Sequence, residues 1–157
     1  MATRGVFAAI VRQEAGILPQ ILLIQRAGKP DGSGYPEQWE LPGGGTDPGE
    51  TDEQCVVRNA LEETGLHIKS TKVASIDFTA PPGVVSPQSD DACVHLCEVV
   101  GGKYKSFPTG SHLDARWVTI NDLFTGKVHI LTNPTSKGFV SRMMKMILAG
   151  FHAHQMR

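Results

Sequence analysis

Short apolar runs rich in β-branched residues predict most of the strands of this chain. The runs Val6–Val11 and Ile21–Ile24 are the clearest, and Gly16 and Pro19 interrupt the chain between them. A loop is expected over 27–36, where Gly, Pro and Asp are frequent. The expected strands are 6–11, 21–24, 38–41, 72–78, 92–99 and 115–119.

Two segments instead have the spacing of apolar residues that is typical of helices. The first helix is predicted over 52–64, because Thr51 and Gln54 fit a capping box and Gly65 fits the left-handed residue that ends a helix. The second helix is predicted over 136–154. Strands combined with two helices in one short chain predict an α/β fold with a central mixed sheet.

The first helix is expected to have one apolar side and one polar side. On a wheel at about 100° per residue, the side expected to dock on the sheet holds Val57, Ala60, Leu61 and Thr64. The side expected to face a cleft holds Arg58, Asn59, Glu62 and Glu63. Arg58 precedes Glu62 by one helical turn, which is within reach of an ion pair.

The length and composition are those of a single compact domain. The chain has 157 residues, of which 40% are hydrophobic, and this is enough for one core. We therefore expect one domain over 1–157. The 15 Lys and Arg residues are balanced by 16 Asp and Glu residues, so the net charge of -1 argues against a long nucleic acid as partner.

No segment of the sequence is expected to enter a membrane. Residues Met1 to Gly5 are not followed by the features of a signal peptide, and no apolar run has the length of a bilayer span. We expect a cytoplasmic location, and the sequence leaves a homodimer open. The three cysteines are then expected to be reduced, and a zinc site made by Cys93 and Cys97 is disfavoured because this pair lacks two further ligands at suitable spacing.

A glycine-rich turn directly before a helix with several carboxylates predicts a cation site. The residues from Gly43 to Gly45 have no side chain to keep a pyrophosphate away from the backbone. Glu50 lies just before the helix, and Glu62 and Glu63 lie near its end. Clustered carboxylates repel one another unless a cation compensates, and oxygen ligands favour Mg²⁺ or Mn²⁺ over Zn²⁺. Either glutamate of the pair taken alone would be read as part of a solvated helix face.

The full spacing resembles the box of the Nudix hydrolase family. The residues that carry the resemblance are Gly44, Glu50, Arg58, Glu62, Glu63, Gly65 and Leu66. All fixed positions of the family pattern match except one. The resemblance is strong over 39–66 and looser over the rest of the chain, where Arg116–Val118 is similar to the entry into a later strand of the family.

This resemblance implies an α/β/α sandwich that hydrolyses a nucleoside diphosphate linked to another group, with Mg²⁺ or Mn²⁺ bound on the box helix. The implied metal ligands are the Gly43 carbonyl and the carboxylates of Glu50, Glu62 and Glu63. Arg58 would orient these carboxylates. Gly44 and Gly45 would border the substrate, which would be a small nucleotide derivative.

Asn59 departs from the family pattern, which has a glutamate at this position. An amide does not accept a proton usefully at neutral pH, and it would ligate a metal without negative charge. We therefore expect slowed hydrolysis with a base elsewhere, for which Asp114, expected in the loop before Arg116, is the first candidate and Glu98 the second. An exposed loop acid is an equally good interpretation of Asp114. The alternative function is a nucleotide-binding sensor or regulatory module that has lost hydrolysis.

The box does not specify the substrate. Pro81 lies close to the place where ADP-ribose-cleaving relatives carry a proline, but the segment 79–83 also fits an ordinary turn. Tyr35 and Trp39 are candidates for stacking on a base, although aromatic residues beside strands belong more often to a core. Oxidised nucleoside triphosphates, dinucleoside polyphosphates and nucleotide sugars all fit the sequence.

Overall fold

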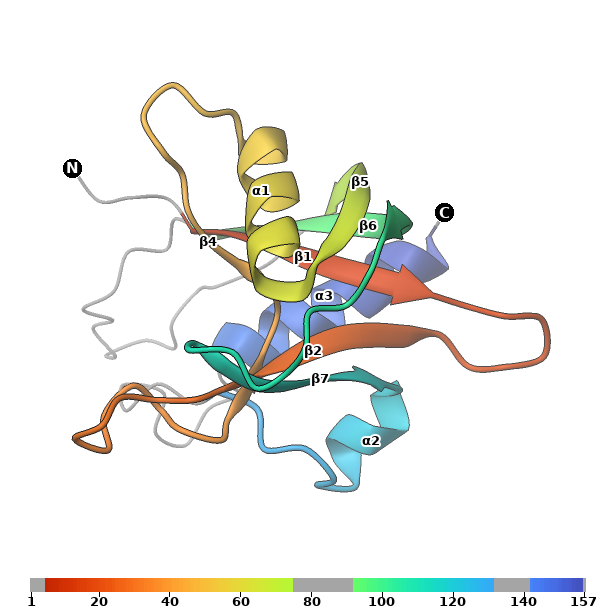
Figure 1. Ribbon diagram of the computed structural model, residues 1–157. Coiled ribbons are helices and arrows are strands. Elements are labelled where there is room, and N and C mark those ends of the chain that lie inside the picture. Colours follow the sequence, from red (N-terminus) through yellow and green to blue (C-terminus); the bar gives the residue numbers. More distant parts are fainter. Residues whose placement is uncertain (1–4, 75–91, 132–141, 157) are drawn as a thin grey trace, which may run out of the picture.

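The computed structural model describes residues 5–74, 92–131 and 142–156 (Figure 1). The strands are β1 (Gly5–Arg12), β2 (Gln20–Arg26), β3 (Trp39–Glu40), β4 (Gly43–Gly45), β5 (Leu66–Ala74), β6 (Ala92–Gly102) and β7 (His112–Val118). The helices are α1 (Asp52–Thr64), α2 (Ile120–Phe124) and α3 (Arg142–Gln155). None of these described helices has the length and apolar character needed to cross a membrane.

Strand β1 lies at the centre of the sheet. One of its edges pairs in parallel with β6, and β5 continues the sheet beyond β6. The other edge is divided, because its first residues pair with β4 and its last residues pair with β2, both antiparallel. Strands β3 and β7 flank β2 on its two sides. Parallel and antiparallel pairs occur together, so the predicted mixed sheet is confirmed.

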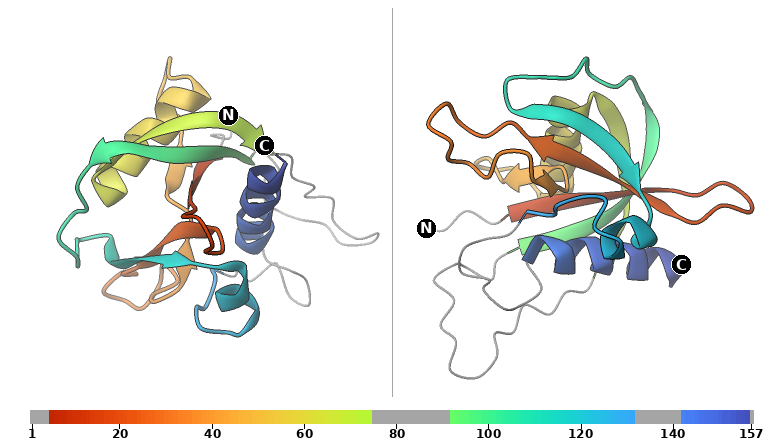
Figure 2. Two further views of the ribbon diagram at one scale, coloured as in Figure 1. Left: turned by 90° about the vertical axis from the view of Figure 1, so that its right-hand side faces the viewer. Right: turned by 90° about the horizontal axis from the view of Figure 1, so that it is seen from below.

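Helices α1 and α3 cover opposite faces of the sheet (Figure 2). Alternate side chains of β1 point to the two faces and separate two hydrophobic cores. Ala9 and Val11 belong to the core beneath α3, and Ala8 and Ile10 belong to the core beneath α1. This three-layer arrangement confirms the α/β/α sandwich that the sequence resemblance implied.

Most of the predicted elements are present, with shifted ends. Helix α1 spans the predicted residues, and its capping box is confirmed, because the Thr51 hydroxyl accepts from the Gln54 N–H while the Gln54 side chain accepts from the Thr51 N–H. The strand predicted at 72–78 begins earlier, at Leu66. Residues 75–78, Pro81 and residues 136–141 of the predicted last helix lie outside the described residues.

Two short elements were not predicted. Strand β4 consists of three glycines, which have no intrinsic preference for strands and form one here only through pairing with β1. A Cβ at Gly43 would lie 2.4 Å from the Val6 carbonyl oxygen, so only glycine fits there. Helix α2 has its own capping box of Thr119 and Asp122, a signal that is visible in the sequence.

Candidate functional site

Helix α1 buries only part of the side that was predicted, since Ala60 and Thr64 are fully buried as expected but two other residues differ. Leu61, expected in the core, is 38% exposed, and Asn59, expected on the open face, is only 8% exposed. The prediction was therefore wrong for both residues. The side chains of Cys55 and Val56, in the first two turns, are fully buried and orient the helix on the sheet. The spacing of apolar residues alone does not show which side of the helix faces the sheet. The buried side comprises Cys55, Val56, Asn59, Ala60 and Thr64.

Arg58 holds the loop before the helix and the helix itself in one arrangement. Its Nε and Nη2 atoms donate to the two oxygens of Glu50 at 2.7 and 2.9 Å. Nη2 also donates to the Gly45 carbonyl at 3.2 Å, and Nη1 donates to Glu62 at 3.3 Å. Asp47, which the sequence did not single out, lies 3.3 Å from Nε. This is the geometry that the predicted orienting role of Arg58 requires.

Glu50 is ionised in this arrangement. Its side chain is 12% exposed, and Oε1 also accepts from the Asp47 N–H at 3.0 Å. The hydrogen bonds from Arg58, followed by that from Asp47, lower the pKa of Glu50 to about 2. The carboxylate is thus kept as an anion at one fixed place before α1.

Glu63 lies at the other end of the helix, against the glycine strand. Its Oε2 accepts from the Gly43 N–H at 2.9 Å. This contact involves the N–H of Gly43 and does not bear on its carbonyl, which the sequence resemblance assigned to a metal. The pKa of Glu63 is raised to about 8, chiefly by burial; the hydrogen bond from Gly43 opposes this rise, and the neighbouring Glu40 and Glu62 contribute to it.

Glu40 forms a polar cluster beside Glu63 that the sequence analysis missed. The Glu40 side chain accepts from Arg26 Nη1 at 2.9 Å and contacts His112 Nε2 at 3.2 Å. Glu40 and His112 are buried, with 8% and 6% exposure, so they are held by these contacts rather than by water. The only signal in the sequence was the place of Glu40 inside the conspicuous segment Trp39–Gly45.

Asn59 occupies the boundary between α1 and β4. Its Nδ2 donates to the Cys55 carbonyl at 3.0 Å, and a Cβ added to Gly44 would lie 3.0 Å from its Oδ1. The absence of a side chain at Gly44 therefore gives Asn59 its space. Asn59, where a departure from the family pattern was expected, thus lies in a buried contact and not on the outer face of the helix.

The other predicted site residues are not gathered with these carboxylates. Asp114 was expected in a loop but lies on β7, where it is exposed and accepts from the Ala115 N–H at 2.8 Å. Strand alternation gives Ala115 to the face of α1 and Asp114 to the opposite face. Trp39 is 5% exposed within the core beneath α3, which agrees with the core interpretation and leaves no open ring face for stacking. Tyr35 is 37% exposed, and Glu98 is exposed on β6.

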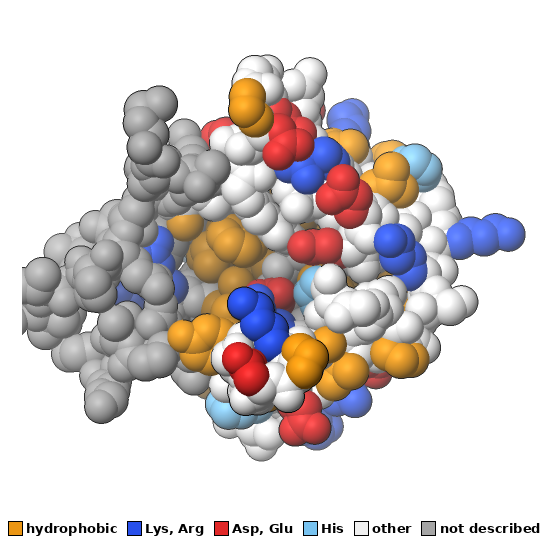
Figure 3. All heavy atoms as spheres, turned by 60° about the vertical axis from the view of Figure 1, so that its left-hand side comes forward, with side chains coloured by type: hydrophobic (Ala, Val, Ile, Leu, Met, Phe, Trp, Pro, Cys, Tyr) orange, Lys and Arg blue, Asp and Glu red, His pale blue; other side chains and the backbone are white. Residues whose placement is uncertain are grey.

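The described residues fit a hard divalent cation. Acidic side chains gather around basic ones over α1 on the face shown in Figure 3. Glu62 has a side chain that is 60% exposed, next to the largely desolvated Glu63. A divalent ion would offset the cost of ionising Glu63 beside Glu40, and carboxylate oxygens are the ligands that Mg²⁺ and Mn²⁺ prefer.

Comparisons with known proteins find one family and one fold. The family model described as the NUDIX domain matches residues 1–142. A Caenorhabditis elegans protein whose name describes it as a nudix hydrolase is 32% identical over 125 residues, covering 80% of this chain and 31% of that protein. A Bacillus subtilis protein named as an 8-oxo-dGTP diphosphatase is 42% identical over 67 residues, covering 43% of this chain and 38% of that protein. The chain spans about a third of the length of these curated relatives.

A solved structure shows the same fold. The ADP-ribose pyrophosphatase from Streptococcus suis superposes with a TM-score of 0.66 at 22% identity. The superposition covers 99% of this chain and 93% of that one. Nearly the whole arrangement of strands and helices is therefore shared, at an identity that bears on the fold alone.

Proposed function

Because this chain belongs to the Nudix family, we propose that it hydrolyses the pyrophosphate linkage of a nucleoside diphosphate derivative and depends on Mg²⁺ or Mn²⁺. A bound ion of this kind would neutralise pyrophosphate oxygens and lower the pKa of a water molecule. The residues proposed to hold it are Glu50, Glu62 and Glu63. Asn59 is proposed to slow the reaction, because it supplies neither the charge nor the basicity of the glutamate in the family pattern.

The observation that carries this proposal is the placement of Glu63. Its carboxyl group is desolvated, it lies near two other glutamates, and it is fixed by a hydrogen bond from Gly43. A purely structural acid at this place would cost stability without a compensating charge. A cation site explains why the carboxylates of Glu40 and Glu62 lie near the desolvated Glu63.

Each neighbouring residue has a role in this proposal that follows from its contacts. Arg58 holds the side chains of Glu50 and Glu62 in place by donating to both. The glycines of β4 border the site with backbone only, so that phosphate oxygens can approach. The base stays unassigned, since the position of Asp114 on the opposite face of the sheet does not support the role that the sequence suggested for it.

The substrate class is proposed from the relatives. An oxidised nucleoside triphosphate and ADP-ribose correspond to what the Bacillus and Streptococcus proteins are named for. Both contain the linkage that the proposed chemistry requires, so both belong in the first panel of substrates. A cytoplasmic location is part of the same proposal.

Asn59 favours a second candidate function, in which the domain binds a nucleotide derivative without cleaving it. The buried amide of Asn59 stands where the family pattern has a glutamate. In that case the protein would act as a sensor, and a nucleotide would raise the melting temperature without being consumed.

The test is product release from a panel of nucleoside diphosphate derivatives with Mg²⁺ or Mn²⁺. Glu63→Gln removes the charge at the same size, and we expect kcat/KM to fall about 100-fold or more, as the loss of roughly 3 kcal/mol of metal-assisted stabilisation implies. Glu53→Gln, on the exposed first turn of the same helix, is the matched control and should keep the activity. Absence of turnover in the unaltered protein, together with thermal stabilisation by nucleotide, would establish the sensor instead.

A further inference from the structure

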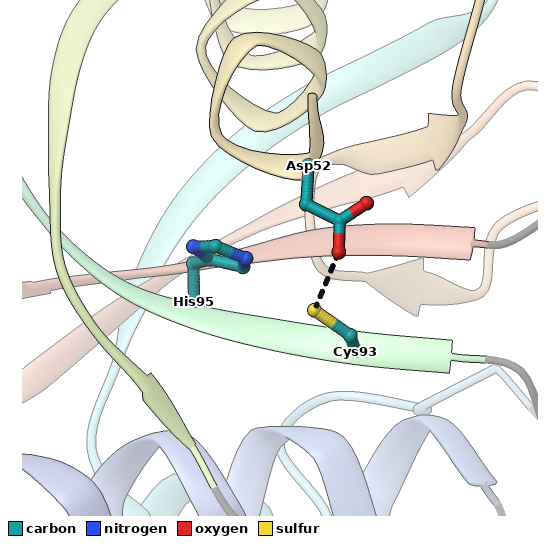
Figure 4. A group of neighbouring side chains, drawn as sticks. All are labelled: Asp52, Cys93 and His95. Atoms are coloured by element: carbon teal, nitrogen blue, oxygen red, sulfur yellow. Dashed lines mark hydrogen bonds between the residues drawn. The ribbon is translucent and has the colours of Figure 1, made fainter. Parts of the chain in front are cut away.

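Three side chains with metal-binding atoms meet at the opposite end of α1 from Glu63. They are Asp52, Cys93 and His95, and their ligand atoms all lie within 4.8 Å of one another. Figure 4 shows the Asp52 carboxylate directed at the Cys93 sulfur, with the His95 ring beside them. At 1.5 Å per helical residue, Asp52 and Glu63 are separated by about 16 Å along the helix. This cluster is therefore distinct from the site proposed for hydrolysis.

The fold places these three residues together through two elements. Cys93 and His95 are alternate residues of β6, so both point to the face covered by α1. Asp52 is the first residue of α1, and its side chain points toward that face. The Cys93 thiol donates to Asp52 Oδ2 at 3.9 Å, and both β6 side chains are buried, with 5% and 6% exposure.

The orientation of His95 is set by a hydrogen bond on its far side. Its Nδ1 lies 2.7 Å from the Ser70 hydroxyl on β5. Metal-binding histidines commonly hold one ring nitrogen in a hydrogen bond of this kind, which fixes the ring and leaves the other nitrogen for the metal. If Nδ1 donates its proton to Ser70, then Nε2 is the basic nitrogen.

We propose that Asp52, Cys93 and His95 bind a Zn²⁺ ion that fastens the start of α1 to β6. A thiolate, an imidazole and a carboxylate form a ligand set that suits Zn²⁺ far better than Mg²⁺, and three protein ligands leave a fourth position for water. On binding, the Cys93 thiol loses its proton to the solvent and the sulfur becomes a ligand. Zn–ligand distances of about 2.0–2.3 Å in a tetrahedral site place the donor atoms about 3.3–3.8 Å apart, so the cluster must contract by about 1.5 Å at most.

Cys97 allows a specific site to be distinguished from unspecific metal binding by buried thiols. Cys97 follows on the same face of β6, but its sulfur donates to the His95 carbonyl at 3.3 Å and lies outside the cluster. Burial, and then the charge of Glu53, raise the pKa of Cys97 to about 12, so it remains a thiol. Cys97→Ser is therefore the matched control for Cys93→Ser.

The experiment replaces Zn²⁺ by Co²⁺, whose bond to a thiolate gives a charge-transfer absorption in the near ultraviolet. Metal-free protein titrated with Co²⁺ should develop this band at one equivalent, and Zn²⁺ should displace it. The band should persist in Cys97→Ser and disappear in Cys93→Ser. Ser70→Ala, which removes only the partner of the His95 ring, should weaken Zn²⁺ binding about 10- to 100-fold.

The readout does not depend on hydrolysis. Glu63→Gln should lose activity and keep the Co²⁺ band, so failure of the proposed hydrolysis and failure of this proposal are distinguishable. If one equivalent of Co²⁺ gives no band in the unaltered protein, or if Cys93→Ser retains it, the cluster is a hydrogen-bonded group only and the proposal is overturned.

Discussion

Gly44 and Asn59 form a close contact between β4 and α1, at the position where the sequence was expected to depart from the Nudix pattern. The contact is tight, since the backbone of β4 approaches the Asn59 amide without an intervening side chain. Asn59 also donates to the carbonyl and to the sulfur of Cys55, at 3.0 and 3.3 Å. A neutral amide satisfies these partners in a buried place, whereas a carboxylate would face a backbone carbonyl without a counter-charge.

Asn59→Glu should therefore lower the stability of the protein and raise its activity. Without a divalent ion, the introduced carboxylate is buried and unpaired, and we expect the free energy of unfolding to fall by about 1–3 kcal/mol. With Mg²⁺ the loss should be largely recovered, and turnover should rise above that of the unaltered protein. Thermal melts in EDTA and in Mg²⁺, with the activity assay, measure both effects.

Asn59→Gln supplies the matched control for this substitution. It has the length of glutamate without the charge, so its melting temperature should respond to Mg²⁺ no more than that of the unaltered protein. An equal response of the two variants would show that size, and not charge, governs this position.

At the scale of elements, the ends of a helix could be predicted from residues near them in the sequence. A strand that depends on pairing with a distant strand could not. Helix α1 was predicted to the residue because Thr51, Gln54 and Gly65 mark its ends by interactions within a few residues. Strand β4 was missed because three glycines become a strand only through contact with β1. The burial of Asn59 and the exposure of Leu61 were also missed, since they depend on how α1 packs against the rest of the fold.

The capping box of α2 predicts a pH-dependent stability. The Thr119 N–H donates to Asp122 Oδ2 at 2.9 Å, and this hydrogen bond is the main reason that the pKa of Asp122 is lowered from its ordinary value of 3.8. A lowered pKa means that the carboxylate stabilises the fold above the unfolded value and loses this effect as the pH falls through the folded value. The difference in melting temperature between the unaltered protein and Asp122→Ala should thus be largest near neutral pH and shrink below about pH 4.

Thr119→Ala tests the other half of the same box. It removes the hydroxyl that accepts from the Asp122 N–H, and the cost should be about 1 kcal/mol. Because this hydroxyl does not titrate, the cost should vary with pH less than that of Asp122→Ala. Equal pH profiles for the two variants would contradict this assignment.

At the scale of the whole molecule, the packing of α3 and the proposed chemistry lie on different faces of the sheet. Helix α3 approaches β1 closely through Gly150, where a Cβ would lie 2.5 Å from the Ala9 Cβ. The carboxylates of α1 lie on the other face. The sequence predicted this helix from its spacing, but Gly150 as a contact with β1 required the observed packing.

Gly150→Val should destabilise the protein without altering the proposed site. The added side chain overpacks the core beneath α3, and we expect a loss of about 1–3 kcal/mol in the free energy of unfolding by denaturant. At temperatures well below the melting transition, kcat/KM should remain close to its original value. His152→Val, an exposed change on the same helix, should leave the stability nearly unchanged, and a fall in kcat/KM of folded Gly150→Val would show that the two faces are coupled.

The divided edge of β1 has a mechanical consequence. Where β1 changes partner, the Ala8 N–H donates to the Pro42 carbonyl at 2.8 Å, at the corner from which β4 and β2 diverge. Glu40 lies on β3, which pairs with β2, whereas Glu63 accepts a hydrogen bond from Gly43 on β4. The two acids are therefore attached to different partners of β1, and the backbone at this corner sets the distance between them.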